Sequence, residues 1–337
     1  MRFRLAVAGA FAVSVLLSAQ NTTPVPNWPR EAERPDAPKP KPAPNEVAEL
    51  VGEYEGPKRT DGTATRLYLL EQDGQAMYIV DRGEIRPVPK APVTRTGDGR
   101  IAAITVDSVR YLRQQVGPEG SGQLRVEPIR PVADVLKESM TVQPPAETGD
   151  FLRADLVELV TLDQTIHLDI RYATTNNFLG SVFYAQARAF LQRPAADSLL
   201  RVQRQLKPLG YGLLVHDGYR PWFVTRTFWE CTPQDKKWLV ANPASGSKHN
   251  RGAAVDLTLY DLATGAVIDM PSTYDESTSR AYAFYPGGTS LQRWHRALLR
   301  RLMEAEGFTV NPDEWWHFDY KDWRRYALGN VAFGQVK

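Results

Sequence analysis

The chain has 337 residues, of which 42% are hydrophobic and 24% are charged, and its formal net charge is +2. This composition is that of an ordinary globular protein with room for one large and one smaller domain, and the balanced charge gives no reason to expect a nucleic-acid partner. Cys231 is the only cysteine, which excludes an intrachain disulfide and a cysteine-rich zinc site. We predict that Cys231 is a small buried apolar side chain.

The N-terminus has the order of a secretory signal peptide. Arg2 and Arg4 precede an apolar run over residues 5–17, and small residues follow up to Ala19. We therefore predict a signal peptide over residues 1–20 and a mature protein that is periplasmic or secreted. The alternative is a retained N-terminal anchor. The apolar run disfavours it, because a membrane-spanning helix needs about 20 apolar residues, and we predict no membrane span in the mature chain.

The next part of the chain divides by composition. Residues 21–45 are rich in proline and predict an extended linker. Residues 46–130 predict a small all-β accessory domain of hairpins, because β-rich runs alternate with turn signals. It has no cluster of metal-ligating side chains, so we assign it no chemistry, and a ligand-binding role stays open. Residues 131–150 are polar and contain prolines, which predicts a second linker. The β-rich runs are residues 65–70, 76–80, 101–106 and 123–126.

Residues 151–330 mix strand and helix patterns without strict alternation. Apolar residues recur at helical spacing over residues 195–209 and 291–306, and a glycine lies at the end of each pattern. Such a mixture predicts an α+β fold, with a mainly antiparallel sheet and flanking helices. The predicted strands of this region are residues 156–160, 166–172 and 211–216.

Two short segments of this region combine histidines with carboxylates. His249 and Asp256 lie in a segment where Gly252 favours a loop that runs into a strand. Alone, such a pair is more typical of a hydrogen-bonded structural contact. His317 adds a third ligand, and nitrogen and oxygen ligands of this kind suit Zn²⁺. Three protein ligands with an open fourth position are typical of a catalytic zinc site.

His317 lies in an aromatic run, residues 313–320, that has the pattern of a buried strand. Aromatic core packing explains Trp315 and Phe318, but it does not explain a glutamate and a histidine among them, since an unpaired buried polar group costs several kcal/mol. On a regular strand Glu314 and His317 would point to opposite faces. We therefore predict a bulge, a twist or a strand end between them.

Five motifs in the same order resemble the zinc D-Ala-metallopeptidases of the bacterial cell wall, and most closely the D-alanyl-D-alanine dipeptidases of the VanX type. The resemblance covers residues 151–330, which we assign as a zinc D,D-dipeptidase domain. The motifs are Arg171-Tyr-Ala-Thr-Thr-Asn-Asn-Phe178, Asp217-Gly-Tyr-Arg-Pro221, His249-Asn-Arg-Gly252, Asp256-Leu-Thr-Leu259 and Glu314-Trp-Trp-His317.

The resemblance implies a role for each matching residue. It implies one zinc ion per chain, held by His249, Asp256 and His317. It makes Glu314 the general base and places Arg220 opposite the scissile carbonyl, where a guanidinium would stabilise the developing oxyanion. The implied substrate-binding residues are Asp275, which would meet the substrate ammonium, and Tyr172 and Ser247.

The leading hypothesis is an exported metallopeptidase that hydrolyses D-alanyl-D-alanine by zinc-activated water. Export favours turnover or salvage of wall peptides over glycopeptide resistance, because an exported enzyme does not reach the cytoplasmic dipeptide pool. One alternative is a D,D-carboxypeptidase or endopeptidase that acts on peptidoglycan stem peptides. Another is a zinc-containing wall-binding protein without activity. Glu314 and Arg220 argue against it, because neither is needed merely to hold zinc.

Overall fold

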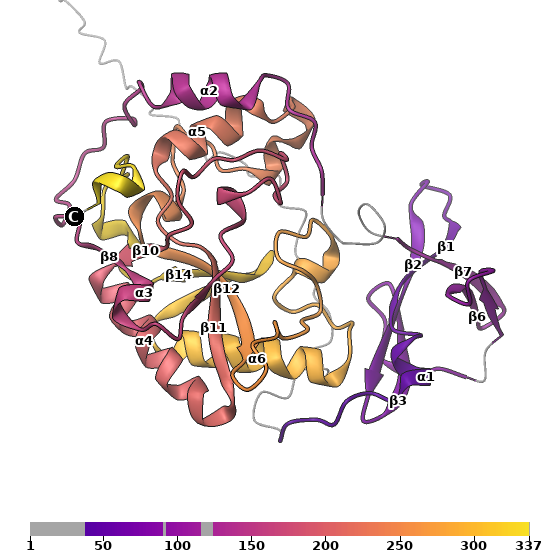
Figure 1. Ribbon diagram of the computed structural model, residues 1–337. Coiled ribbons are helices and arrows are strands. Elements are labelled where there is room, and N and C mark those ends of the chain that lie inside the picture. Colours follow the sequence, from indigo (N-terminus) through magenta and orange to yellow (C-terminus); the bar gives the residue numbers. More distant parts are fainter. Residues whose placement is uncertain (1–37, 90–91, 116–123, 337) are drawn as a thin grey trace, which may run out of the picture.

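The computed structural model describes residues 38–89, 92–115 and 124–336, which form two large sheets with helices around the second (Figure 1). The predicted signal peptide, residues 1–20, and most of the proline-rich segment lie outside the described residues. None of the helices within those three ranges combines the length and the apolar character that a membrane crossing requires.

Residues 52–113 form a seven-stranded antiparallel sheet, with the short helix α1 (Asn45–Ala48) before it. The β2–β3 hairpin turns at the predicted Asp73 and Gly74, whose φ angles of 51° and 82° suit a tight hairpin turn. In spatial order the strands are β4 (Arg86–Pro87), β3 (Gln75–Val80), β2 (Ala64–Gln72), β1 (Gly52–Lys58), β7 (Val109–Arg113), β6 (Ile101–Val106) and β5 (Val93–Arg95).

Three of the four predicted β-rich runs in this part are strands β2, β3 and β6. The fourth prediction was wrong for residues 124–126, which have no strand structure. The Val126 backbone N–H instead donates to the Phe178 carbonyl (2.8 Å), and its side chain is buried in the core of the second unit. This tertiary contact prevails over the local β propensity.

Residues 131–336 build a mixed α+β unit around a five-stranded sheet, as the sequence predicts. This sheet is antiparallel except for the parallel pair β9–β11. In spatial order its strands are β13 (Phe308–Asn311), β14 (Glu314–Tyr320), β12 (Ala254–Asp261), β11 (Tyr211–Asp217) and β9 (His167–Leu168), and β8 (Leu156–Glu158) pairs separately with β10 (Phe190–Gln192). The helices are α2 (Val132–Ser139), α3 (Leu159–Leu162), α4 (Arg193–Leu206), α5 (Trp222–Cys231) and α6 (Ser290–Ala305).

The two predicted helices are present as α4, which continues as a 3-10 turn to Leu209, and α6. Cys231 is fully buried at the end of α5, as predicted. Residues 131–150, which the sequence analysis assigns to a linker, contain helix α2. Val132 and Val135 of α2 are buried in the larger core, because this helix packs against α5. The polar residues on its other face conceal this contact in the sequence.

Candidate active site

Three neighbouring strands place polar residues in one row across the five-stranded sheet. Asp217, at the end of β11, pairs with Asp256 of β12, and Asp256 pairs with His317 of β14. Residues directly opposite each other on antiparallel strands point to the same face, with Cβ atoms about 5 Å apart. The strand register therefore brings together residues from three separate motifs.

His249 reaches this row from the short 3-10 helix Lys248–Arg251, just before β12. The Ser247 hydroxyl accepts a hydrogen bond from the His249 backbone N–H (3.3 Å) and so caps this helix. Gly252 ends it with a φ of 65°, where a larger residue would be strained and would also collide with the Leu156 side chain. The prediction of a loop that runs into a strand is confirmed.

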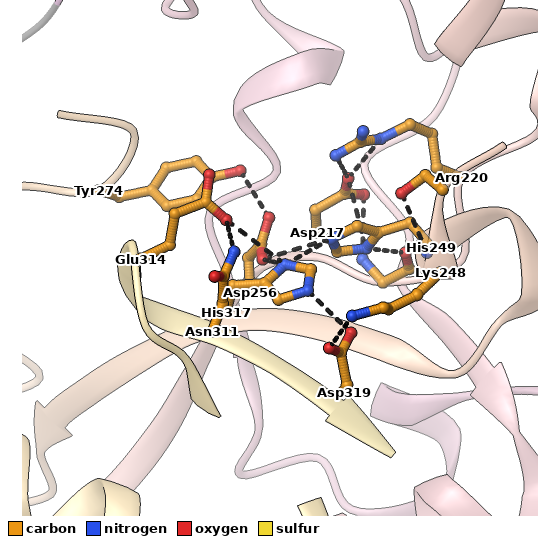
Figure 2. Close-up of polar contacts among 12 residues, drawn as sticks. Asp217, Arg220, Lys248, His249, Asp256, Tyr274, Asn311, Glu314, His317 and Asp319 are labelled. Atoms are coloured by element: carbon orange, nitrogen blue, oxygen red, sulfur yellow. Dashed lines mark hydrogen bonds and ion pairs between the residues drawn. The ribbon is translucent and has the colours of Figure 1, made fainter. Parts of the chain in front are cut away.

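The side chains of His249, Asp256 and His317 point toward one another (Figure 2). His317 Nδ1 lies 2.9 Å from Asp256 Oδ1 and 3.1 Å from His249 Nε2. The third edge of the triangle, His249 Nε2 to Asp256 Oδ1, is 3.3 Å. All three residues are buried, so these atoms lie in the protein interior with little exposure to solvent.

The outer hydrogen bonds of both histidines decide which nitrogen carries the proton. His249 Nδ1 faces the Gly218 carbonyl oxygen at 2.8 Å, and a carbonyl only accepts. His317 Nε2 faces Asp319 Oδ1 at 3.0 Å. When each outer nitrogen donates, His249 Nε2 and His317 Nδ1 both present lone pairs to the Asp256 carboxylate. Three electron-pair donors then meet with no proton between them, an arrangement that needs a cation.

This donor set fits a metal ion such as zinc. Ligands that lie 2.0–2.1 Å from a tetrahedral zinc are about 3.3 Å apart, close to the separations of 2.9, 3.1 and 3.3 Å between the three atoms. In the protein without a metal ion, a proton on His317 provides the positive charge instead. Burial lowers the pKa of His317, but the carboxylates of Asp256 and Asp319 outweigh burial and raise this pKa to about 10.

Glu314 meets His317 because the sheet is irregular between them. Asn311 of β13 pairs with Glu314, whereas the preceding Val310 pairs with Phe318, so β14 bulges over the residues between. This bulge is the irregularity that the sequence predicts. The Glu314 carboxylate lies 3.8 Å from His317 Nδ1 and accepts a hydrogen bond from Asn311 Nδ2 (2.9 Å). Trp315 and Phe318 are buried, as expected for core side chains.

The environment of Glu314 suits a general base. Loss of water contact raises its pKa first, the nearby Asp256 carboxylate raises it further, and the two histidines oppose this rise. Its side chain remains 41% exposed, so a substrate or a water molecule can reach it. A carboxylate with a raised pKa accepts a proton more readily at neutral pH.

Arg220 is held rigidly by Asp217. Its Nε and Nη2 donate to Asp217 Oδ2 at 3.0 and 2.7 Å, and Asp217 Oδ1 accepts from the Tyr184 hydroxyl (2.8 Å). The guanidinium lies 5.3 Å from the ring centre of Tyr172. The buried Tyr172 therefore supports Arg220 through a cation–π contact. The Arg220 backbone N–H also donates to the His249 carbonyl, which ties the arginine to the ligand segment.

Asp275 lies half-buried in the loop between β12 and α6, in a left-handed conformation with a φ of 63°. Burial raises its pKa to about 7, with added contributions from the carboxylates of Glu314 and Asp256. Non-glycine residues rarely adopt this conformation, and such strain concentrates at functional sites. A carboxyl that is costly to ionise is suited to a cationic partner, which would stabilise its negative charge.

All eight predicted site residues line a single cleft of about 1560 Å³. The cleft is large for a small-molecule pocket, which typically has about 300–1,000 Å³. Its walls also include residues of the seven-stranded sheet, among them Glu53, Glu55 and Arg66. The structure thus brings all eight predicted site residues into one cleft. It also adds a wall from the seven-stranded sheet, which the sequence motifs do not include.

The part of the chain that contains this cleft is similar to known proteins. A family model described as D-Ala-D-Ala dipeptidase matches residues 153–328. A D-alanyl-D-alanine dipeptidase of Escherichia coli is 32% identical over 174 residues, which cover 52% of this chain and 89% of the relative. Relatives of the same name from Enterococcus faecalis and Streptomyces coelicolor are 35% and 33% identical, over 48% and 52% of this chain and 90% and 93% of their own lengths.

The chain belongs to the D-Ala-D-Ala dipeptidase family. The family match contains all eight predicted site residues. It also lies inside residues 151–330, where the sequence motifs place the resemblance. The seven-stranded sheet, residues 52–113, lies outside the match. This member of the family therefore carries a sheet of its own that borders the cleft.

Sequence reasoning missed two residues that orient the site. Asp319 accepts from His317 Nε2 and receives a further contact from Lys248. Tyr274 donates its hydroxyl hydrogen to Asp256 Oδ2 (3.1 Å), which turns Oδ1 of the same carboxylate toward the histidines. Asp319 could have been found, because residues two apart on a strand share a face and His317 lies two positions before it. Tyr274 lies in a loop and gives no such signal.

Proposed function

We propose that this protein is an exported zinc metallopeptidase that hydrolyses D-alanyl-D-alanine, with residues 151–330 as its catalytic domain. One observation carries the proposal: one potential ligand atom from each of His249, Asp256 and His317 lies close to the other two, in the same cleft as Glu314 and Arg220. The names of the family relatives support the substrate. The signal-like N-terminus supports export, and with it turnover or salvage of cell-wall peptides.

A zinc ion, when bound by His249, Asp256 and His317, supplies Lewis-acid activation of water and of the peptide carbonyl. Glu314 accepts the proton that the attacking water loses, and then donates it to the nitrogen of the leaving D-alanine. A C–O bond forms, the C–N bond breaks, and two molecules of D-alanine result. The raised pKa of Glu314 favours both halves of this proton transfer.

Arg220 stabilises the negative charge that develops on the carbonyl oxygen of the substrate. Asp217 binds two of its nitrogens, so the guanidinium is oriented before substrate arrives and loses little entropy on binding. Asp275 accepts the substrate ammonium at the other end of the dipeptide. The positive charge of the substrate ammonium would stabilise the ionised form of this carboxyl, which its surroundings otherwise disfavour. Tyr172 and Ser247 complete the pocket by supporting Arg220 and His249.

The size of the cleft favours one further candidate, a D,D-carboxypeptidase that acts on peptidoglycan stem peptides. A dipeptide fills a small part of about 1560 Å³, and a longer peptide would extend along the wall of the seven-stranded sheet. If Asp275 binds the substrate ammonium, peptides that are extended or acylated at this end lose that contact. The free dipeptide should therefore be the better substrate.

The decisive experiment incubates the purified, zinc-loaded protein with D-Ala-D-Ala, L-Ala-L-Ala and a stem peptide that ends in D-Ala-D-Ala. Mass spectrometry should detect D-alanine from the free D,D-dipeptide alone, and a chelator should abolish its release. Release of D-alanine mainly from the stem peptide would support the carboxypeptidase instead. Bound zinc without cleavage of any D,D-peptide would support a wall-binding protein. Cell fractionation tests export, and an uncleaved N-terminus in the cytoplasm would contradict it.

A further inference from the structure

The seven-stranded sheet contacts the segment that carries Asp275. Strands β1 and β2 of this sheet contact residues 279–293, which belong to the loop before α6 and to the first turn of that helix. About nine-tenths of each of three family relatives aligns with about half of this chain, and the family match, residues 153–328, leaves this sheet out, so the sheet is additional to the common catalytic unit. Its role in this protein is therefore open to inference from its contacts.

Glu71 of β2 fixes the start of α6. Its side chain is buried, and its carboxylate accepts hydrogen bonds from the backbone N–H groups of Ser290 (2.7 Å) and Gly74 (2.6 Å). Its carbonyl oxygen accepts from Arg293 Nη2 at 2.7 Å. A carboxylate at a helix N-terminus is also stabilised by the helix dipole. The sheet is thus attached to α6 by buried, charge-assisted hydrogen bonds.

A small apolar core supports this attachment. Tyr68, Leu70 and Ile79 of the sheet are buried together with Tyr285 of the loop. The rings of Tyr68 and Tyr285 meet edge to face, with centres 6.0 Å apart. Burial of such side chains stabilises an interface through the hydrophobic effect. The sheet and the loop therefore form one packed unit rather than two separate bodies in loose contact.

Glu53 of β1 extends this contact to the rim of the cleft. Its carboxylate accepts a hydrogen bond from the Ser279 hydroxyl at 2.5 Å. Burial raises the pKa of Tyr285 well above its usual value, and the charge of Glu53 and a hydrogen bond to Glu53 add to this shift. Glu53 thus holds the loop at two points, Ser279 and Tyr285, and it lines the cleft itself.

From Ser279 the support continues inward to Asp275. The loop is folded around the buried carboxylate of Glu276, which accepts from the Thr273 N–H (3.3 Å) and from the Thr278 hydroxyl. Arg280 pairs with this carboxylate (3.4 Å) and donates to the Pro271 carbonyl (3.0 Å). The loop is therefore a closed, braced unit in which Asp275 keeps its left-handed conformation, and Glu53 anchors the far end of that unit.

We propose that Glu53 is a positioning residue for Asp275, so that the seven-stranded sheet sets the affinity of the cleft for the ammonium end of the substrate. This inference rests on the proposed function, because it takes the substrate ammonium as the partner of Asp275. Glu53 acts through the loop. It does not touch the reacting atoms, so its loss should change the KM for the dipeptide and leave kcat nearly unchanged.

The test compares Glu53→Ala, Glu53→Gln and Glu55→Ala in the full-length, zinc-loaded protein. Glu53→Ala should raise the KM for D-Ala-D-Ala about fivefold, the factor of about one net hydrogen bond, and change kcat less than about twofold. Glu53→Gln retains an acceptor oxygen and should stay near the wild type. Glu55→Ala is the matched control, because it removes the same charge from the same face of β1 and from the same cleft wall, so a change in KM that is larger in Glu53→Ala reports the contact with the loop and not the charge of the wall.

Hydrogen–deuterium exchange supplies a readout that is independent of activity. Backbone amides of residues 271–285 should exchange faster in Glu53→Ala than in Glu55→Ala. Unchanged KM and exchange in Glu53→Ala would overturn the inference, and so would an equal loss of kcat with a lower Tm, which marks a structural role only. Ser279→Ala repeats the test if Glu53→Ala does not fold. A wild type without dipeptidase activity would refute the proposed function, whereas the exchange data would still decide whether Glu53 braces the loop.

Discussion

The two ends of the cleft are built in different ways. At the proposed metal end, the register of three central strands aligns Asp217, Asp256 and His317, and each strand is held by hydrogen bonds to its neighbours. At the proposed ammonium end, Asp275 lies in a loop, and its support passes through the buried Glu276 and then Ser279 to another sheet. One end depends on regular secondary structure, and the other on side-chain contacts between two units.

This difference reflects what metal binding and ammonium recognition each require. Metal ligands must keep their positions within a few tenths of an ångström, which strands at the centre of a sheet provide. Recognition of an ammonium group tolerates more variation, so a loop that another unit supports is sufficient. The common catalytic unit therefore contains the whole metal end, whereas the ammonium end is where this protein adds residues from outside the family match. Substitutions at the two ends should have different kinetic signatures.

The largest effect is expected at the metal end, from Glu314→Gln. Removal of the proton acceptor should lower kcat about 10²–10⁴-fold, the usual contribution of general acid–base catalysis, with little change in KM. Because Glu314 is not one of the three converging ligands, zinc content measured by mass spectrometry should equal that of the wild type. A variant that hydrolyses D-Ala-D-Ala at the wild-type rate would remove Glu314 from the mechanism.

A smaller effect is expected from Asp319→Asn, which weakens the outer support of His317. Asp319 keeps the proton on Nε2, and loss of such a partner typically lowers metal affinity about 10–100-fold. A competition titration with a chromophoric chelator measures this affinity. Asp322→Asn, a nearby and partly exposed aspartate, is the control. Equal zinc affinities in both variants would show that strand register alone orients His317.

The sequence predicted the local structure around His249, Asp256 and His317 because its determinants are local. The change from the glycine-bearing loop at Gly252 to the β-favouring residues of β12 placed Asp256 on a strand, and the incompatible spacing of Glu314 and His317 required the bulge that β14 has. The family motifs added the roles of Glu314 and Arg220. Periodicity also located α4 and α6, since their apolar faces pack on the sheet.

The remaining features depend on contacts between distant segments, which no local pattern encodes. The sequence of helix α2 resembles a polar linker, because its buried Val135 faces α5, a helix about 90 residues further along the chain. Val126 has a β-favouring neighbourhood but packs beside Phe178. The contact of Glu53 with Ser279 joins residues 226 positions apart, and neither residue belongs to a recognisable motif. Of these contacts, the one between Glu53 and Ser279 supports the loop that carries Asp275.

The smallest expected effect is a pH dependence of the KM for D-Ala-D-Ala. It would separate the two ends of the cleft most directly. The pKa of Asp275 is raised to about 7, so its carboxyl becomes neutral as the pH falls below this value and no longer attracts an ammonium. The KM for D-Ala-D-Ala should therefore rise about fivefold between pH 7 and 6, because the ionised fraction of Asp275 falls from about one half to about one tenth. It should rise again above about pH 8, where the substrate amine loses its proton. Asp275→Asn should have a high KM that does not change between pH 6 and 7.

Ionisation of Asp275 should also affect the stability of the protein, in the opposite direction to its effect on substrate binding. Because the folded protein holds the Asp275 proton up to about pH 7 and the unfolded chain releases it near pH 4, the native state binds more protons in this interval, and its stability falls as the pH rises. Asp275→Asn should therefore have a higher Tm than the wild type at pH 8, while it binds substrate less well. Asp313→Asn is the control, since burial raises the pKa of this cleft carboxyl as well. If Asp313→Asn rather than Asp275→Asn removes the acidic rise in KM, the ammonium end lies at the turn before β14, and the brace from Glu53 serves another purpose.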